Sequence, residues 1–397
     1  MRILLSCLQS TRQYRLPAYQ YWETYFRGGI AEGGHQCETV PGVDWAEGLT
    51  YEHAPSEAAA WRGRTWQRTV DSIAALEPAA RPDVFLSYLY PWMVDEGAIR
   101  EIRRLGVPCV NYFCDNVRAF TSAPPEYQPF DLHWVPELAA TRLYQRAGYP
   151  FIHAAMPTWV SPAQRTWDHP ERYGVTFIGS RDPLREVLLA DAIRLGAPIE
   201  LRGTGWPAGG KPPEPFPDAI GMRTGALATL RNQWNDLRRY GPIGYGRKIA
   251  GRFRRPVDDA LLAPNVRAKP DAQEYVELTQ QSILVLGVNR YPSYRFPFER
   301  PDTYSRGRDI EAPMMGACYL TEWTGELETM YDVGKEIATF RDAPEMVEKI
   351  RMLQSNPGLR REMRRTAQRR ALTEHSIPRT LERIAERLGI ATMRTVT

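Results

Sequence analysis

The stretch "SRGRDIEAPMMGACYLTE", Ser305–Glu322, decides how the second half of this chain is understood. Arg308 and Glu311, an acid that looks buried, open a short helix of small residues. Gly316 ends this helix and a short apolar strand follows. Small residues permit a close approach of the backbone to a ligand or to a neighbouring element. The charge beside this core element predicts either a binding site or a local ion pair between residues three positions apart.

Length and composition limit the class of protein. A chain of 397 residues exceeds one ordinary core, so we expect two domains. A net charge of +4 argues against a protein whose whole surface binds polyanions. Five scattered cysteines without a CxxC pair predict reduced thiols in a cytoplasmic protein, and no disulfide framework or zinc site. No apolar run approaches the roughly 20 residues of a membrane span.

The first 157 residues alternate short apolar runs with helical patterns. Strands are expected at 2–8, 83–90, 108–114, 130–136 and 150–157, and helices at 16–34, 96–106 and 137–148. Such alternation is typical of a parallel sheet covered by helices. We therefore expect a Rossmann-like domain at 1–157.

A second alternating series begins after a connection rich in Pro, Trp and charge. Strands are expected at 174–180, 198–206 and 282–288, and Asp182 should cap a helix that starts at Pro183. The stretch at about 207–262 is expected to be an irregular basic insert. We place a second Rossmann-like domain at 158–375 and a C-terminal helix and tail at 376–397. Ligands of such sheets bind at the carboxyl ends of the strands.

Two loops at these strand ends carry candidate binding residues. Gly179 and Ser180 lie between a strand and a helix N-terminus, where free N–H groups attract phosphate, and Arg181 and Arg185 follow. The alternative is a glycine turn with solvated arginines. Asn289 and Arg290 end a second buried strand, where the alternative is an ordinary strand end.

Glu311 is a suitable acceptor for paired hydroxyls such as those of ribose. Its alternatives are a contact with the helix dipole or a pair with Arg308. Asp115 follows a strand of the first domain and is a candidate general base for an acceptor hydroxyl. Its alternative, which we favour, is an Asx turn or a helix cap. His133 and His153 lie in strands and are expected to be core residues.

These segments together resemble the second domain of group 1 glycosyltransferases, specifically the branch typified by the spore-maturation protein CgeB. The resemblance rests on "VTFIGSRDPLREVLL", "SILVLGVNR", "RGRDIEAPMMGACYLTEWTGELETMYDVGKEI" and "LRREMRRTAQRRALTEHSIPRTLERI". It covers roughly 174–384, and the first half matches more loosely. The resemblance implies an α/β GT-B fold, with two Rossmann-like domains facing a central cleft and the C-terminal helix returning to the first domain.

The resemblance also implies roles for residues. Glu311 would bind the donor ribose, while Arg308 and a loop at Thr321–Glu322 would lie near the nucleotide. The Gly179–Ser180 turn with Arg185 would face the diphosphate, and Arg290 is a further catalytic candidate. Retaining members carry two glutamates separated by seven residues, the second at the position of Glu311. Here the first position is Thr303, beside Asp302, so the acid that contacts the donor sugar stays open.

The residues themselves suggest how a leaving diphosphate would be neutralised. The sequence holds no Asp-x-Asp triplet, and paired carboxylates usually hold a metal-bound diphosphate. We therefore expect arginines and a helix N-terminus to serve instead, with no metal and no cofactor besides the donor substrate.

The insert segment Arg231–Arg255 has eight Lys and Arg against one acid, Asp236, with aromatic and aliphatic residues interleaved. It could lie on an anionic bilayer or hold a polyanionic acceptor, although a solvated basic face is the simpler alternative. No nucleic-acid motif accompanies it.

The sequence therefore predicts a hexosyltransferase-type enzyme. Its partners would be a nucleotide sugar and a glycan, lipid-linked or other cell-surface acceptor. The protein would be cytoplasmic, in peripheral contact with the inner membrane face through 231–255. The alternative, suggested by Thr303, is an inactive GT-B scaffold or sensor that binds nucleotide sugars.

Overall fold

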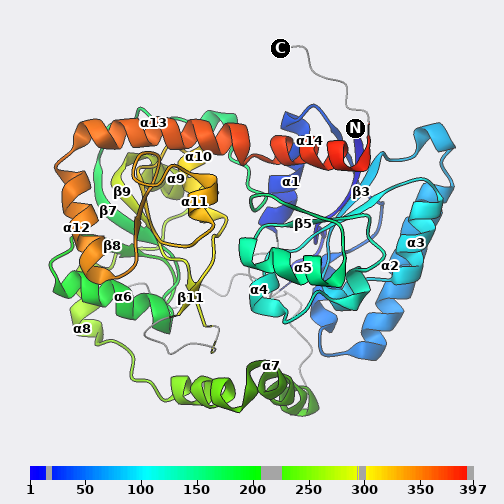
Figure 1. Cartoon of the computed structure of the whole chain (residues 1–397), viewed down its shortest axis with the longest axis horizontal. Helices are drawn as coiled ribbons and strands as arrows, with labels where there is room; N and C mark the ends of the chain where they lie inside the picture. Colours follow the sequence, from blue (N-terminus) through cyan, green and yellow to red (C-terminus); the bar gives the residue numbers. More distant parts are fainter. Residues whose placement is uncertain (15–19, 207–225, 293, 295–300, 391–397) are drawn as a thin grey trace. The chain divides into compact units, whose positions relative to one another are not determined.

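A computed structural model describes residues 1–14, 20–206, 226–292, 294 and 301–390, with the backbone alone for 226–232. The chain forms two compact units, each with its own parallel sheet (Figure 1). The first unit holds Met1–Trp159, Pro215–Trp234 and Ser376–Thr397, and the second holds Val160–Glu214 and Asn235–His375.

Unit 1 is built on a six-stranded sheet in which every neighbouring pair is parallel. In spatial order its strands are β2 (Gln36–Glu38), β1 (Arg2–Ser6), β3 (Val84–Tyr88), β4 (Cys109–Tyr112), β5 (Leu132–Val135) and β6 (Phe151–His153). Its helices are α1 (Tyr21–Glu32), α2 (Pro55–Ala74), α3 (Glu96–Arg104), α4 (Asn116–Ala119), α5 (Thr141–Ala147) and α14 (Ile377–Leu388). Parallel strands require crossover connections, and these helices supply them.

Aromatic side chains fill the core of unit 1. Trp22 and Phe26 of α1 pack on Tyr112 of β4, with ring centroids 5.4 and 5.9 Å away. On the same helix, a Cβ at Gly29 would lie 2.5 Å from the Cβ of Ile377 on α14. The missing side chain therefore lets the C-terminal helix pack directly on the first helix, as expected for a GT-B chain.

Unit 2 has a five-stranded sheet that is also wholly parallel. In spatial order its strands are β13 (Ala338–Phe340), β12 (Tyr319–Glu322), β9 (Ser282–Gly287), β7 (Tyr173–Ile178) and β8 (Ile199–Arg202). Strands β10 (Arg290–Tyr291) and β11 (Asp302–Thr303) form a separate antiparallel pair. The helices of this unit are α6 (Pro183–Arg194), α8 (Asp259–Leu262), α9 (Ala272–Gln281), α10 (Arg308–Met314), α11 (Leu327–Met330), α12 (Ala343–Gln354) and α13 (Pro357–Glu374).

The opening stretch of the sequence packs where small residues allow it. Gly316 has a φ of +85°, and a Cβ there would lie 2.5 Å from the Cα of Trp167. Its carbonyl accepts a hydrogen bond from the buried guanidinium of Arg364 on α13 at 3.0 Å, which also donates to the Gln280 carbonyl at 2.7 Å. One arginine thus satisfies the carbonyls at the ends of α10 and α9.

Two long helices were not expected from the sequence. The insert, predicted to be irregular, contains α7 (Ala226–Arg252), which breaks at Gly241 with a φ of 67° before Pro242. The break at Gly241 and Pro242 leaves helical runs on either side, and Gly244, Gly246 and Gly251 lie within the second run. Helix α2 begins at Pro55 and buries Ala58, Trp61, Thr65, Thr69 and Ile73, a spacing that the sequence already displays.

The cysteines form no disulfide, as the sequence predicted. All five cysteines are free, and four of them are buried. Among the described residues, no helix has both the length and the apolar character that crossing a bilayer requires.

His133 of β5 is a core residue, as expected, and it makes stability depend on pH. It is 1% exposed and its ring packs against Tyr127 and Tyr144. Burial lowers the pKa of His133 from 6.5 to about 3. The unfolded imidazole therefore binds a proton that the folded one does not, so stability decreases as the pH falls from 6.5 towards 3.

We predict that this loss reaches about 1.4 kcal/mol per pH unit. His133→Phe keeps an aromatic ring and should reduce the slope of unfolding free energy against pH, as measured by urea denaturation between pH 7 and pH 4. Equal slopes for His133→Phe and the unchanged protein would contradict the assignment.

Candidate active site

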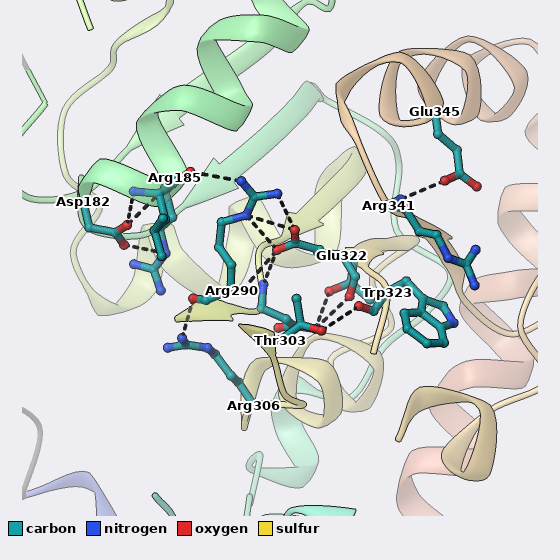
Figure 2. Close-up of polar contacts among 12 residues, drawn as sticks. Asp182, Arg185, Arg290, Thr303, Arg306, Glu322, Trp323, Arg341 and Glu345 are labelled. Carbon is teal, nitrogen blue, oxygen red and sulfur yellow. Dashed lines mark hydrogen bonds and ion pairs between the residues drawn. The ribbon is translucent and has the colours of Figure 1, made fainter. Parts of the chain in front are cut away.

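Polar side chains meet at the carboxyl ends of β9 and β12 in unit 2. Glu322, the last residue of β12, has a side chain only 4% exposed. Arg290 donates from Nε to Glu322 Oε1 at 2.9 Å, and its guanidinium also reaches the Leu184 carbonyl of α6 at 3.3 Å (Figure 2). The backbone N–H groups of Asn289 and Arg290 both donate to Glu322 Oε2 at 3.1 Å. Glu322 therefore fixes the turn that leaves β9 and holds the guanidinium of Arg290.

A second buried carboxylate, Asp309, joins α10 to the same strands. Asn289 Nδ2 donates to its Oδ2 at 3.0 Å. Tyr319 Oη and Thr321 Oγ1 of β12 donate to its Oδ1 at 2.8 and 3.0 Å. The N–H of Arg306 donates to Oδ2 at 2.9 Å. Burial raises the pKa of Asp309, and these hydrogen bonds oppose that shift.

The buried acid of the stretch is thus Asp309, and the expectation that Glu311 fills this place was wrong. Asp309 is fully buried, whereas Glu311 is half-buried. A signal was present in the sequence, because Asp309 shares a helix face with Ala312, Pro313 and Gly316 at spacings of three, four and seven residues. The small residues that pack on the sheet carry Asp309 inward with them.

Glu311 and Arg308 are connected through a tyrosine of α9. Tyr275 Oη donates to Glu311, and the Arg308 guanidinium donates to Tyr275 Oη. That guanidinium also lies 4.8 Å from the centre of the Tyr275 ring. Burial raises the pKa of Tyr275, so its phenol stays protonated. The pair that the sequence suggested at three residues' separation is bridged by this phenol.

The Gly179–Ser180 turn after β7 is close-packed. A Cβ at Gly203, whose φ is +135°, would lie 2.3 Å from the Gly179 carbonyl oxygen. The N–H of Gly179 donates to the Arg202 carbonyl at 2.8 Å, and that of Arg181 donates to the Thr204 carbonyl at 2.9 Å. These two N–H groups are therefore satisfied by the protein, contrary to the expectation that the turn offers free donors to phosphate.

The N-terminus of α6 is likewise occupied by the predicted cap. Asp182 Oδ1 accepts from the N–H groups of Leu184 and Arg185 at 3.0 Å each. Arg181 donates to Glu186 of α6 and to Asp259, near the end of the insert, at 2.7 Å each. An anion at this edge of the sheet would consequently meet side chains more than backbone donors.

Three arginines supply those side chains: Arg185, Arg290 and Arg306 (Figure 2). Arg185 Nη1 donates to Ser180 Oγ at 3.1 Å, and Arg306 Nη2 donates to the Arg290 carbonyl at 2.9 Å. Burial lowers the pKa of Arg185, the carboxylate of Asp182 at 3.1 Å opposes this shift, and the positive charge of Arg306 adds to it. Two cations that repel each other in a partly buried place favour an anion between them. We call these three residues the arginine cluster.

Arg306 was not among the predicted site residues, although it belongs to the opening stretch. Its guanidinium lies 4.9 Å from the centre of the Tyr304 ring. Its Nε is buried and, within the described part of the chain, has no hydrogen-bond partner. A buried N–H donor without an acceptor is costly, so this position favours an anionic acceptor.

Thr303 and the Thr321–Glu322 segment complete this edge. Thr303 Oγ1 donates to the Trp323 carbonyl at 3.1 Å, and the residue pairs with Arg290 across β10 and β11. The sequence had suggested a loop at Thr321–Glu322. The structure shows instead that these two residues end strand β12. Both are buried and hold neighbouring groups in place.

A cavity of about 520 Å³ lies along α6 and the start of α12. Arg290 and Arg341 line its polar side, and Leu184 and Leu188 line its apolar side. The Arg341 guanidinium lies 4.4 Å from the centre of the Trp323 ring. This volume is in the range of small-molecule sites, so the cavity beside Arg290 could hold part of a small ligand.

In unit 1, Asp115 comes after β4 and precedes α4, and it is half-buried. The next residue, Asn116, is fully buried, donates to Glu137 Oε2 at 2.7 Å and accepts from Tyr144 Oη at 2.7 Å. This network holds the backbone beside Asp115 in a fixed position.

No group of three or more His, Cys, Asp or Glu in the described ranges could hold a metal ion. The charged groups that the structure brings together in unit 2 are the arginine cluster and its buried carboxylates.

Comparisons with known proteins give the family context. Residues 223–386 match the model of a family described as "Glycosyl transferase-like". No curated protein matches the sequence.

The whole chain is similar in structure to glycosyltransferases of the GT-B fold. Sucrose-phosphate synthase of Thermosynechococcus elongatus matches with a TM-score of 0.53 and 13% identity, over 98% of this chain and 99% of that chain. HepE of Anabaena, solved with UDP-glucose, matches with a TM-score of 0.55 and 12% identity, over 98% and 100%. A glycosyltransferase of Rickettsia africae matches with a TM-score of 0.54 and 10% identity, over 98% and 99%. At these identities the likeness establishes the fold, and the predicted GT-B fold is confirmed.

The two acids of α10 should differ sharply in their effect on stability. Asp309→Ala removes the acceptor of Tyr319 Oη, Thr321 Oγ1 and the Arg306 N–H, and we expect it to lower the free energy of unfolding by about 3–5 kcal/mol. Glu311→Ala removes a half-buried acceptor and should cost about 1 kcal/mol. Urea denaturation of both variants measures the difference, and similar losses would show that Asp309 does not hold this edge together.

Proposed function

We propose that this protein transfers a sugar, of the hexose type, from a nucleotide diphosphate sugar to an acceptor hydroxyl without a metal ion. The observation that carries the proposal is the arginine cluster at the carboxyl ends of β7 and β9. The match of 223–386 to a glycosyltransferase-like family and the GT-B fold support the same reaction class. HepE of Anabaena was solved with UDP and with UDP-glucose, which supports a nucleotide sugar as donor.

Arg185 and Arg306 would neutralise the leaving diphosphate. A leaving diphosphate gains negative charge as the glycosidic bond breaks, and fixed guanidinium groups stabilise that charge most when water is excluded. Arg290 is already paired with Glu322, so we assign it to positioning the β9 turn and one side of the ligand. Gly179, Ser180 and Asn289 would shape the same edge.

Glu311 and Arg308 would hold the nucleoside. The carboxylate of Glu311 is a natural acceptor for two ribose hydroxyls, and Tyr275 holds it in place. Asp115 remains our candidate for the base that accepts the proton of the acceptor hydroxyl. We propose a glycan, a lipid-linked sugar or another cell-surface molecule as the acceptor.

The second candidate function is an inactive GT-B protein that binds nucleotide sugars without transfer. Thr303 favours it, because this residue stands where retaining relatives carry an acid and its hydroxyl is bonded to a carbonyl. Thermal shifts with UDP-, GDP- and dTDP-sugars would identify the donor, since a ligand raises the apparent stability of the state it binds. Sugar transfer or donor hydrolysis then separates an enzyme from a scaffold.

For the arginine cluster we predict that Arg306→Met and Arg185→Met each weaken nucleotide-sugar binding at least about tenfold and lower kcat by about 100-fold or more. Methionine keeps part of the apolar stem and removes the charge. Arg369→Met on the exposed face of α13 is the matched control and should behave as the unchanged protein.

EDTA should leave the activity unchanged. Full activity in both cluster variants would exclude the diphosphate assignment, and activity lost in EDTA and restored by Mg²⁺ would exclude the metal-independent reaction.

For Glu311 we predict a specific loss of ribose recognition. The unchanged protein should bind UDP about tenfold more tightly than 2′,3′-dideoxy-UDP, because a charged acceptor loses two hydroxyl donors. Glu311→Ala should bind both nucleotides equally, at the weaker affinity, in isothermal titration calorimetry. A preference for UDP that persists in Glu311→Ala would place the ribose elsewhere.

A further inference from the structure

The second half of α7 carries an apolar face that points to solvent. After the break at Gly241, Ile243, Gly246, Ala250 and Phe253 follow one another at spacings of three, four and three residues. Such spacing places them on one face of a helix, with Phe253 in the turn that ends it. All four are exposed. We call them the α7 face.

The two large members of the α7 face are unusually exposed. Ile243 is 72% exposed and Phe253 is 82% exposed. Every other large hydrophobic side chain in the described ranges is 54% exposed or less. Single exposed apolar residues are common, but two that are nearly fully exposed on one helix face call for an explanation.

The other side of this helix is already packed. A Cβ at Gly244 would lie 2.8 Å from the Cβ of Tyr240 and 3.2 Å from the Tyr294 carbonyl oxygen. Lys248 is paired with Asp236, an acid of the preceding helical run. Contacts of this kind occur on the side of Gly244 and Lys248. On the α7 face, by contrast, a Cβ at Gly246 would have no atom of the described residues within 4 Å.

Charge along residues 235–255 is almost entirely positive. Residues 235–255 contain seven Lys and Arg and the single acid Asp236, which Lys248 neutralises. Arg252 and Arg255 are exposed beside Phe253, and Arg247 lies one turn after Ile243. The face thus combines protruding apolar side chains with a border of long cationic ones.

These features identify the kind of partner. A helix that lies in a membrane interface buries its apolar face at the boundary of headgroups and acyl chains, while arginines at its border meet anionic headgroups. Long cationic side chains can extend to the headgroup level while their stems cover apolar surface. The phosphates of a nucleic acid could bind the arginines, but a nucleic acid would not bury the apolar side chain of Ile243. A second copy of this face would bring like charges together.

We propose that the α7 face docks this protein on the surface of an anionic lipid bilayer. Ile243 and Phe253 enter the headgroup boundary, and the exposed Arg252 and Arg255 contact the lipid phosphates. This inference does not rest on the transfer reaction. If the acceptor is lipid-linked, docking would bring the protein to its substrate.

Sedimentation with vesicles tests the proposal on the full-length chain. We expect binding to phosphatidylcholine vesicles that contain 30% phosphatidylglycerol, and at least about tenfold weaker binding to phosphatidylcholine alone. Binding should weaken as salt rises, because the charges are exposed. Ile243→Ser/Phe253→Ser and Arg252→Glu/Arg255→Glu should each reduce partitioning at least about tenfold, with an unchanged Tm.

Two matched controls isolate the α7 face. Leu76→Ser/Met352→Ser removes two other exposed apolar side chains, each 37% exposed, and Arg142→Glu/Arg146→Glu reverses the charge of two exposed arginines on α5. Both controls should bind vesicles as the unchanged protein does. Equal binding to both lipid compositions, or vesicle binding that neither α7 variant reduces, would overturn the proposal. So would binding to single-stranded DNA with no binding to anionic vesicles.

Discussion

The edge of unit 2 where ligands of this fold bind depends on one buried carboxylate. Asp309 accepts hydrogen bonds from Asn289 after β9, from Tyr319 and Thr321 on β12, and from the backbone at Arg306. A carboxylate buried in a protein is stable only when donors satisfy it, so these groups must converge. The donors come from the ends of β9 and β12 and from the segment before α10. Their hydrogen bonds to Asp309 therefore fix the position of α10 on the sheet.

This constraint explains how charge is distributed at the site. Asp309 holds the backbone of Arg306, whose side chain then reaches the carbonyl of Arg290. Glu322 holds the Arg290 guanidinium and both N–H groups of the turn. Two buried carboxylates therefore position two cations, and Arg185 on α6 adds a third. These cations lie beside the turn after β7 and the N-terminus of α6. Most backbone N–H groups there already have acceptors within the protein, so an anion would be bound mainly by the arginine side chains.

Local rules predicted much of this arrangement from the sequence. The strands of both sheets except β2, the cap at Asp182 and the end of α10 at Gly316 follow from apolar runs, capping residues and glycine positions. Helix α2 could have been found by its spacing. The insert was predicted to be irregular, but only Gly241 and Pro242 interrupt α7, and Gly244, Gly246 and Gly251 lie within its second helical run.

The sequence by itself determined the fold class and the order of elements, because periodicity, caps and small residues act over a few neighbouring positions. It also placed Arg185, Asn289 and Arg290 at one edge of the second sheet, since the carboxyl ends of parallel strands meet there. Only the tertiary structure decided which acid of α10 is buried, and which donors at the β7 turn were already used. Those outcomes depend on partners up to tens of residues away, such as Tyr319 for Asp309 and Arg202 for Gly179.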